Sequence, residues 1–403
     1  MYIGLDLGTS GLKGILIDAD QKVLAEATAP LTVQRPHDGW SEQSPDSWIT
    51  AAEAVLDKLS AHGLGAVRGI GLSGHMHGAT LLDAADDVLR PCILWNDTRS
   101  HVEAAEMDGD PLFRRVTGNI VFPGFTAPKL AWVQKHEPAL WAKVAKVLLP
   151  KDYLRLWLTG DHVGEMSDAA GTLWLDVAKR DWSDALLAAC DLNRGHMPRL
   201  VEGSAASGHL LPALAQRWGI PAGVVIAGGA GDNAASAIGM GVGVSAIGEG
   251  FVSLGTSGVV FTASDRYTPN PTKAVHAFCH ALPDRWHQMS VMLSAASALS
   301  WAKRALNLES EAALLALAAS LPTADRATAP IFLPYLTGER SPHNNANAQA
   351  SWFGMSASND AASLAYAVAE GVGFGLLDGL QTLSLGNASG LSVVGGGSRS
   401  DWW

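Results

Sequence analysis

The five-residue sequence Leu-Gly-Thr-Ser-Gly occurs twice in this chain, at 7–11 and at 254–258. Each copy lies between two apolar stretches that are typical of β-strands, so each predicts a glycine-rich turn between strands. Such a turn can direct successive backbone N–H groups into one concavity, which binds phosphate oxygens without a cationic side chain. A single copy is a weak signal, since an ordinary hairpin turn has a similar composition. Two copies predict two turns that hold one polyphosphate.

The predicted phosphate-binding residues are Gly8, Thr9, Ser10 and Gly11 in the first turn, and Gly255, Thr256 and Ser257 in the second. The two copies differ in the charges around them, because Asp6 precedes the first and Lys13 follows it. A carboxylate beside a phosphate site predicts a bound Mg²⁺, held directly or through water. For Asp6 the alternative is a turn-capping aspartate. For Lys13, a phosphate contact and a solvated strand lysine are both open.

Asp232, in the stretch GGAGDNAA, is the candidate for a catalytic carboxylate. Transfer of a phosphoryl group to an alcohol needs positioning, neutralisation of charge, and a carboxylate that accepts the hydroxyl proton. Asp232 follows a buried strand and several glycines, and it stands at the start of a short predicted helix. An ordinary aspartate N-cap is the alternative interpretation of the same pattern.

Two further stretches carry side chains that are typical of binding sites. In GHMHGA, His75 and His77 have the spacing of a metal pair, but no second cluster supplies further ligands, and a buried, hydrogen-bonded histidine is the other alternative. In WNDTR, Asp97 and Arg99 either line a polar pocket or form a structural ion pair.

The elements that must position these residues follow from periodicity. Residues 2–34 are predicted to form three strands, and residues 44–62 a helix with Ser44 as N-cap and Pro45 at the first position. A buried strand follows, and then a largely helical insertion from about residue 100 to 220. After about Gly243 the strand, LGTSG and strand pattern restarts. This internal duplication predicts two α/β domains, residues 1–242 and residues 243–403.

Composition limits the class of protein. The chain has 403 residues and a formal net charge of −11, which weighs against a broad nucleic-acid-binding surface. Its three cysteines, Cys92, Cys190 and Cys279, are far apart and suit a reducing compartment. A strand pattern begins at Tyr2 and the most apolar tract contains Asp232 and many glycines, so we expect neither a signal peptide nor a membrane span. These features predict a cytoplasmic protein.

With these motifs in place, the chain resembles the FGGY carbohydrate kinases, a branch of the actin/Hsp70-like ATPases. The resemblance covers essentially the whole chain and is closest to the bacterial members that act on xylulose. It rests on MYIGLDLGTSGLKGILID, GHMHGATLLD, ILWNDTR, FTAPKLAWVQKH, SDAAGTLWLDVAKRDWS, GGAGDNAASAIG, SLGTSG, FLPYLTGERSPHNN and VVGGGSRS. It implies an α/β fold of two actin-like (ribonuclease-H-like) ATPase domains with an interdomain cleft.

The resemblance also implies an activity: phosphorylation of D-xylulose to D-xylulose 5-phosphate by ATP and Mg²⁺, in pentose (xylose) catabolism. It implies that Asp232 is the base and binds the sugar, that Asp6 is a catalytic group that helps to hold Mg²⁺, and that Asn233 binds a sugar hydroxyl. It makes Met76 and His77 sugar contacts, with Asp97 in the same pocket. The last glycine turn resembles the family's turn beside adenosine, although a plain strand-ending turn is the alternative; its residues are Gly395, Gly396 and Gly397.

Several alternatives stay open at this point. A sibling kinase for ribulose, gluconate or another polyol shares most of the motifs. An actin/Hsp70-like ATPase module without sugar chemistry would leave GHMHGA and WNDTR unexplained, and a catalytically silent sugar-binding protein would not need Asp6 and Asp232. The family usually continues beyond the last glycine turn, so the second domain is expected to be truncated at Trp403. Strict sugar preference and oligomeric state are left open, with a homodimer as one alternative.

Overall fold

The computed structural model describes residues 1–244, 249–384 and 390–403. The chain divides into two compact units. The first contains Met1–Gly239 together with Phe278–Arg285, and the second contains Met240–Ala277 and Trp286–Trp403. The return of Phe278–Arg285 to the first unit was not predicted from the sequence. Within the described residues, no helix combines the length and the apolar character needed to cross a membrane.

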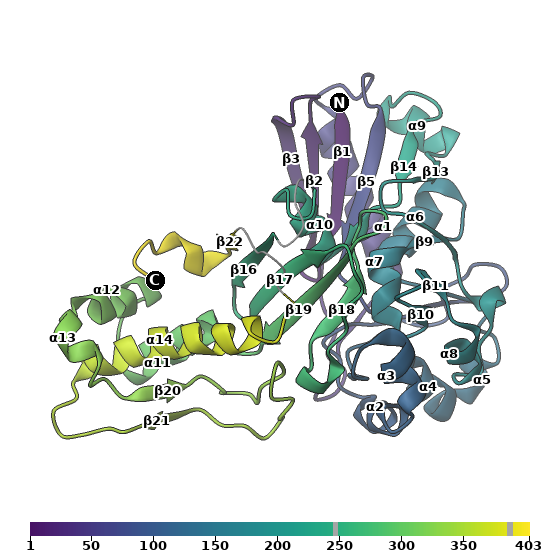
Figure 1. Ribbon diagram of the computed structural model, residues 1–403. Helices are drawn as coiled ribbons and strands as arrows, with labels where there is room; N and C mark the ends of the chain where they lie inside the picture. The colour runs from purple at the N-terminus through teal and green to yellow at the C-terminus, as the bar shows by residue number, and fades with distance from the viewer. Residues whose placement is uncertain (245–248, 385–389) are drawn as a thin grey trace. The chain divides into compact units, whose positions relative to one another are not determined.

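The first unit is built on a mixed sheet with the strand order β13-β14-β5-β1-β2-β3, and β15 pairs with β5 (Figure 1). Strands β1, β2 and β3 are antiparallel neighbours, whereas β5 runs parallel to β1 and to β14. This arrangement confirms the three strands predicted in residues 2–34. The strands are β1 (Tyr2–Leu7), β2 (Gly11–Ile17), β3 (Val23–Pro30), β5 (Gly69–Gly74), β13 (Ala206–His209), β14 (Val225–Ala227) and β15 (Ala230–Gly231).

Helix α1 (Pro45–Ser60) packs against β2 and β3 and buries the predicted apolar stripe. Trp48, Val55 and Leu59 are fully buried there, as expected for one face of an amphipathic helix. A Cβ atom at Gly14 of β2 would lie 2.4 Å from Val55 Cγ1, so the glycine is what allows the helix this close to the sheet. Ser44 takes the N-cap position, but its side chain makes no capping hydrogen bond.

The predicted insertion between about residue 100 and 220 is helical, with short two-stranded sheets. The helices of this part of the first unit are α2 (His101–Asp108), α3 (Pro111–Thr117), α4 (Thr126–His136), α5 (Pro138–Trp141), α6 (Pro150–Thr159), α7 (Met166–Ala169), α8 (Asp184–Ala188) and α9 (Pro212–Trp218), followed by α10 (Asp232–Gly239). Its short strands are β8 (Lys146–Leu148), β9 (Val163–Glu165), β10 (Leu175–Asp176), β11 (Asp181–Trp182) and β12 (Arg199–Val201). Three more short strands precede it, β4 (Glu42–Gln43), β6 (Thr80–Leu82) and β7 (Cys92–Ile93); β4 pairs with β7, and β6 pairs with β8.

The second unit repeats the topology of the first. Its sheet has the order β18-β19-β17-β16-β22, in which β16, β17 and β19 are antiparallel neighbours and β22 runs parallel to β16. The same relation holds for β1, β2, β3 and β5, so the duplication read from LGTSG is a duplication of strand order. The strands are β16 (Gly250–Leu254), β17 (Gly258–Ser264), β18 (His276–Cys279), β19 (Trp286–Met292) and β22 (Leu391–Val394).

The long helix α14 (Ala361–Leu380) packs on this sheet and on its neighbouring helices (Figure 1). Those neighbours are α11 (Ala296–Ala305), α12 (Glu311–Ser320) and α13 (Thr323–Arg326), with the hairpin β20 (Ile331–Leu333) and β21 (Ser351–Phe353) alongside. The small residues of α14 lie where the contacts are closest. A Cβ atom at Gly371 would lie 2.2 Å from the backbone oxygen of Phe332, whereas one at Gly373 would meet nothing within 4 Å.

These two glycines provide a matched test of the packing. Alanine favours helix over glycine by up to ~1 kcal/mol, so Gly373→Ala is expected to stabilise the second unit by about that amount. Gly371→Ala makes the same change in propensity but forces α14 away from β20, and is expected to destabilise by about 1–3 kcal/mol. Denaturant unfolding of the two variants beside the parent chain measures both. Equal effects of the two substitutions would contradict this account of the helix contact.

Candidate active site

The first glycine turn joins β1 to β2 and is held from outside by two side chains. Gln43 Nε2 donates a hydrogen bond to the carbonyl oxygen of Thr9 at 2.7 Å. The indole Nε1 of Trp95 donates to Thr9 Oγ1 at 3.0 Å. Within the described part of the chain, the amides of Thr9 and Ser10 make no hydrogen bond. The turn therefore presents two amides and a fixed hydroxyl, which suits an anion.

Trp95 contacts this turn, although the sequence analysis did not predict a role for it. The residue is 46% exposed, so its ring is accessible beside the turn. The available signal was its place in the WNDTR stretch that carries the family resemblance. In the structure its indole links that stretch to the first turn.

Asp6, Lys13 and Ser73 lie side by side on one face of the sheet, because Asp6 is the register partner of both other residues. All three line a cavity of about 560 Å³ that is otherwise mostly apolar and is bounded by α10. Lys13 Nζ forms an exposed ion pair with Glu26 at 2.8 Å, which is the behaviour of a solvated strand lysine. The Asp6 carboxylate is exposed at the cavity.

Asp232 is the first residue of α10, directly after β15. Its Oδ1 accepts hydrogen bonds from the backbone N of Asn233 at 2.7 Å and from Asn233 Nδ2 at 2.9 Å. Among the described residues nothing donates to Oδ2. Burial raises the pKa of Asp232 to about 6, the two bonds from Asn233 oppose that rise, and the negative charge of Asp6 adds to it. The carboxylate is thus a base whose pKa lies near neutral pH.

Met76 lies against the backbone that leads into Asp232. A Cβ atom at Gly231 would lie 2.9 Å from Met76 Cγ and Sδ, and one at Gly171 would lie 3.1 Å from Met76 Cε. The carbonyl oxygen of Gly171 lies within hydrogen-bond distance of His77 Nδ1, at 2.9 Å. The structure therefore brings Met76, His77 and the start of α10 into one part of the first unit.

His77 adopts a left-handed backbone conformation, with φ of 69°. Its carbonyl oxygen accepts hydrogen bonds from Lys129 Nζ at 2.9 Å and from Thr126 Oγ1 at 3.2 Å. Its ring packs 4.6 Å from the ring of Phe125. A strained backbone of this kind persists only where its surroundings fix it, and here the FTAPKLAWVQKH stretch does so. Burial lowers the pKa of Lys129 to about 7.

A metal pair at His75 and His77 receives no support from the geometry. Among the described residues, no group of three or more His, Cys, Asp or Glu side chains is arranged to hold a metal ion. His75 is fully buried against the ring of Trp48, and burial lowers its pKa to about 4. It is therefore a buried histidine, but it departs from the satisfied one of the alternative, since neither ring nitrogen has a hydrogen-bond partner among the described residues.

Asp97 is committed to a structural ion pair. It is fully buried, and its two oxygens accept hydrogen bonds from the backbone N of Ser41 at 2.6 Å and from Arg99 at 2.7 and 2.9 Å. Arg99 also pairs with Glu42 at 2.7 Å and lies 3.6 Å from the ring centroid of Trp40. Both carboxylate oxygens are occupied, which favours the ion-pair alternative for Asp97 over the sugar contact predicted for it.

The second glycine turn joins β16 to β17 in the second unit. The carbonyl oxygen of Thr256 accepts hydrogen bonds from the backbone N of Ala295 at 3.1 Å and from Ser297 Oγ at 2.9 Å. The turn is thus anchored by its carbonyl groups to the start of α11. A Cβ atom at Gly395, whose φ is 90°, would lie 2.8 Å from the oxygen of Leu254. The last glycine turn, Gly395 to Gly397, therefore packs against the second one.

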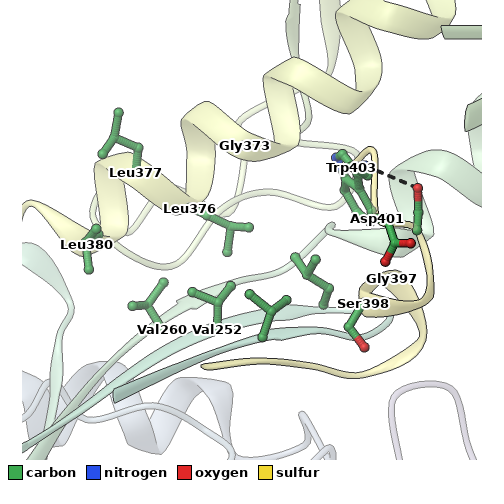
Figure 2. Close-up of a pocket in the computed structure, with 13 residues that line it drawn as sticks. Val252, Val260, Gly373, Leu376, Leu377, Leu380, Gly397, Ser398, Asp401 and Trp403 are labelled. Carbon is green, nitrogen blue, oxygen red and sulfur yellow. Dashed lines mark hydrogen bonds between the residues drawn. The ribbon is translucent and has the colours of Figure 1, made fainter. Parts of the chain in front are cut away.

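A cavity of about 530 Å³ lies beside this last turn, between α14 and the sheet of the second unit (Figure 2). Its lining is mainly aliphatic, and Gly397, Asp401 and Trp403 lie at one end. The aliphatic side chains are Val252, Leu254, Val260, Leu376, Leu377, Leu380 and Val393. An aliphatic lining with one carboxylate suits apolar groups, so we place no phosphate contact in it.

Comparison with known proteins identifies the family. Residues 1–239 match the N-terminal domain of the FGGY family of carbohydrate kinases, and residues 250–403 match its C-terminal domain. The chain belongs to the FGGY family of carbohydrate kinases. The predicted resemblance and the two-domain α/β fold are confirmed, and as an FGGY kinase the protein takes ATP and a sugar as its substrates.

Individual relatives agree with this assignment. The chain is 52% identical to the xylulose kinase of Escherichia coli (strain K12) over 408 residues, which cover 100% of this chain and 83% of that protein. A crystal structure of a xyloylose (xylulose) kinase from Brucella ovis shows 54% identity and a TM-score of 0.94, over 100% of this chain and 83% of that one. A gluconate kinase structure from Lactobacillus acidophilus reaches a TM-score of 0.91 at 26% identity, over 100% and 82%.

The assignment of Asp97 to the fold can be tested by stability. Asp97→Ala leaves the buried guanidinium of Arg99 with one carboxylate fewer and is expected to cost about 3–5 kcal/mol of unfolding free energy. Glu26→Ala is the matched control, since it breaks the exposed pair with Lys13 and is expected to cost less than ~1 kcal/mol. Denaturant unfolding distinguishes the two. An Asp97→Ala protein of parental stability would return Asp97 to the list of sugar contacts.

Proposed function

We propose that this FGGY kinase transfers the γ-phosphoryl group of ATP to D-xylulose and releases ADP and D-xylulose 5-phosphate, as a step of pentose catabolism in the cytoplasm. The observation that carries the proposal is the placement of Asp232, a base with a pKa near 6, beside Met76 at the end of β15. The whole-chain identity to a relative named xylulose kinase supports xylulose as the acceptor.

In the proposed reaction Asp232 Oδ2 accepts the proton of the sugar's terminal hydroxyl. The hydroxyl oxygen then forms a bond to the γ-phosphorus, the bond from that phosphorus to the β,γ-bridging oxygen breaks, and ADP leaves. Because Oδ1 is held by Asn233, the free oxygen of Asp232 has a fixed direction. Asn233, Met76 and His77 are the proposed sugar contacts; His77 hydrogen-bonds a hydroxyl and Met76 packs against the carbon chain.

Asp6 is the proposed protein group toward Mg²⁺. Mg²⁺ is usually held by one or two carboxylates together with waters and substrate phosphates, and a single exposed carboxylate beside the first glycine turn fits that requirement. When bound, the ion neutralises charge on the β- and γ-phosphates. The chain itself would position the ligands: Asp6 would hold the ion, and the amides of Thr9 and Ser10 would bind phosphate oxygens.

Each half of the chain contributes a phosphate-binding turn to the proposal. The N-terminal kinase domain, residues 1–242, supplies Gly8–Gly11, and the C-terminal domain, residues 243–403, supplies Gly255, Thr256 and Ser257. We place the adenosine beside Gly395, Gly396 and Gly397, which is supported by the packing of that turn against Leu254. Lys13 is the weakest of the proposed phosphate contacts, because Glu26 already pairs with it.

A substrate panel tests the acceptor. ADP release by the 403-residue chain with Mg-ATP is expected to rise strongly with D-xylulose and little with L-ribulose, gluconate or glycerol. Asp232→Asn keeps the shape of the side chain but removes the base, and is expected to lower kcat by at least ~100-fold. A kcat in this variant close to that of the parent chain would contradict the role of Asp232 as the base. A stronger response to another sugar would replace xylulose while leaving the kinase in place.

The raised pKa of Asp232 predicts opposite effects of pH on activity and on stability. The base must be ionised, so kcat/KM for the sugar is expected to rise with pH through about 6 and then level off. The neutral carboxyl is the form that the folded protein favours, so its contribution to stability is lost as pH rises from about 4 to above 6. Asp232→Asn is therefore expected to be more stable than the parent chain near pH 8, by ~1–2 kcal/mol, and equal to it near pH 4. Denaturant unfolding at both pH values checks the sign; an advantage at low pH only would contradict it.

A further inference from the structure

Five charged side chains form a cluster in the interior of the first unit, behind the loop that leads to Asp232. We call Lys151, Asp152, Arg155, Glu165 and Asp168 the ionic cluster; all five are fully buried. Lys151 Nζ lies 3.0 Å from Asp152 Oδ1, 3.3 Å from Glu165 Oε1 and 3.1 Å from Asp168 Oδ2. Burying so many charges is costly, and apolar residues of similar volume are often at least as stable. The cluster therefore calls for a reason other than stability.

The charges of the cluster balance when Asp168 carries a proton. Burial raises the pKa of Asp168 well above its usual range, against the opposing charge of Lys151. Burial by itself lowers the pKa of Lys151, but the three neighbouring carboxylates raise it above its usual value. Two cations then face two carboxylates, so the cluster can stay in the interior without net charge.

The cluster holds the backbone of residues 227–231, which we call the base loop because Asp232 follows it. Arg155 Nη1 donates to the carbonyl oxygen of Ala227 at 2.7 Å, and Arg155 Nη2 donates to that of Gly228 at 2.6 Å. At the other end, the backbone N of Gly231 donates to Ser167 Oγ at 3.1 Å. The base loop is thus fixed at its first two carbonyl groups and at its last amide.

Ser167 is itself fixed by the cluster. Its Oγ donates to the carboxylate of Glu165, with both oxygens within 3.0 Å, and its backbone N donates to Glu165 Oε2 at 2.7 Å. Glu165 Oε1 also accepts from the backbone N of Asp168 at 2.9 Å and lies near Lys151 Nζ. With its proton committed to Glu165, the Ser167 hydroxyl can only accept toward Gly231. A continuous chain of contacts therefore runs from Lys151 to the residue before the base.

The base loop has little freedom of its own. A Cβ atom at Gly229, whose φ is 75°, would lie 2.1 Å from the oxygen of Leu72, and one at Gly228 would lie 2.3 Å from the oxygen of Glu202. The backbone passes between these two carbonyl groups with no side chain to anchor it. Its place along the passage therefore depends on bonds from outside the loop. The amides of Gly228 and Gly229 donate to the carbonyl oxygens of Ala205 at 2.8 Å and Gly203 at 2.9 Å, and Arg155 and Ser167 hold the two ends.

We propose that Ser167 is a positioning residue for Asp232 and that the ionic cluster holds the base loop, directly through Arg155 and indirectly through Ser167. The inference rests on the proposed function, because it assumes that Asp232 is the base. Ser167 touches no reacting atom. It acts by setting where α10 begins, and so where Asp232 Oδ2 meets the acceptor hydroxyl.

The test compares two variants that lose the same kind of bond. Ser167→Ala leaves the amide of Gly231 without its acceptor. Thr117→Val is the matched control, since Thr117 is equally buried, donates to the carbonyl of Phe113 at 2.8 Å and accepts from the backbone N of Asn119 at 3.1 Å, far from the base loop in sequence. Steady-state kinetics with Mg-ATP and D-xylulose, and hydrogen exchange of peptides covering residues 227–233, are measured on both full chains.

Ser167→Ala is expected to lower kcat by roughly 10- to 100-fold, as for a small displacement of a catalytic group, with the KM for ATP changed less than about twofold. Amide exchange is expected to rise in residues 227–233 of this variant and to be unchanged there in Thr117→Val. Ser167→Thr retains a hydroxyl and is expected to recover part of kcat.

Parental kcat and parental exchange in Ser167→Ala would overturn the proposal, as would an equal loss of kcat in Thr117→Val. If the parent chain shows no sugar-dependent ADP release, the proposed function fails, while faster exchange of the base loop in Ser167→Ala would still support the part of the inference that concerns the loop. The two failures are therefore distinguishable.

Discussion

The passage of the backbone at Gly228 and Gly229 between two carbonyl groups is the constraint on which the site depends. Any side chain there would overlap the oxygen of Leu72 or of Glu202, so only glycine permits β5 and the base loop to lie this close. That approach puts Asp232 beside the residues that follow β5, including Met76 and His77. Because the glycines have no side chain that could hold the loop, neighbouring elements hold it. Backbone carbonyl groups accept from the amides of Gly228 and Gly229, and α6 and α7 add the Arg155 guanidinium and the neutral Ser167 hydroxyl.

The two units have the same strand order, and the differences between them separate features of the fold from features of the proposed chemistry. Both units have a glycine turn between their first two antiparallel strands and a parallel fourth strand. Only the first has an aspartate before the turn, and only the first has a fixed carboxylate at the start of α10. The turn common to both units agrees with the proposed phosphate contacts, and the two aspartates agree with the acid groups proposed for the reaction.

Much of this was accessible from the sequence because it is local. Strand alternation predicted β1, β2, β3, β16 and β17, and the stripe of α1 predicted its buried face. Residues whose roles depend on distant partners were not accessible. Asp97 was predicted as a sugar contact, but Ser41 and Arg99 occupy its oxygens. Trp95 contacts the first turn through a hydrogen bond to Thr9, and the segment Phe278–Arg285 belongs to the first unit. Neither contact could be predicted from the periodicity of apolar residues.

Charged groups lie behind the base loop because the polar atoms of the loop need hydrogen-bond partners in defined directions. An apolar core could fill the same volume at equal or better stability, but it offers nothing to carbonyl oxygens or to an amide that lie in the interior. Arg155 supplies two donors at fixed angles to two successive carbonyl groups, and a neutral hydroxyl shorter than any charged side chain fits the space at Gly231. Lys151 and the carboxylates then satisfy those two side chains in turn. On the proposed function, support for the direction of Asp232 explains the cluster better than a contribution to folding does.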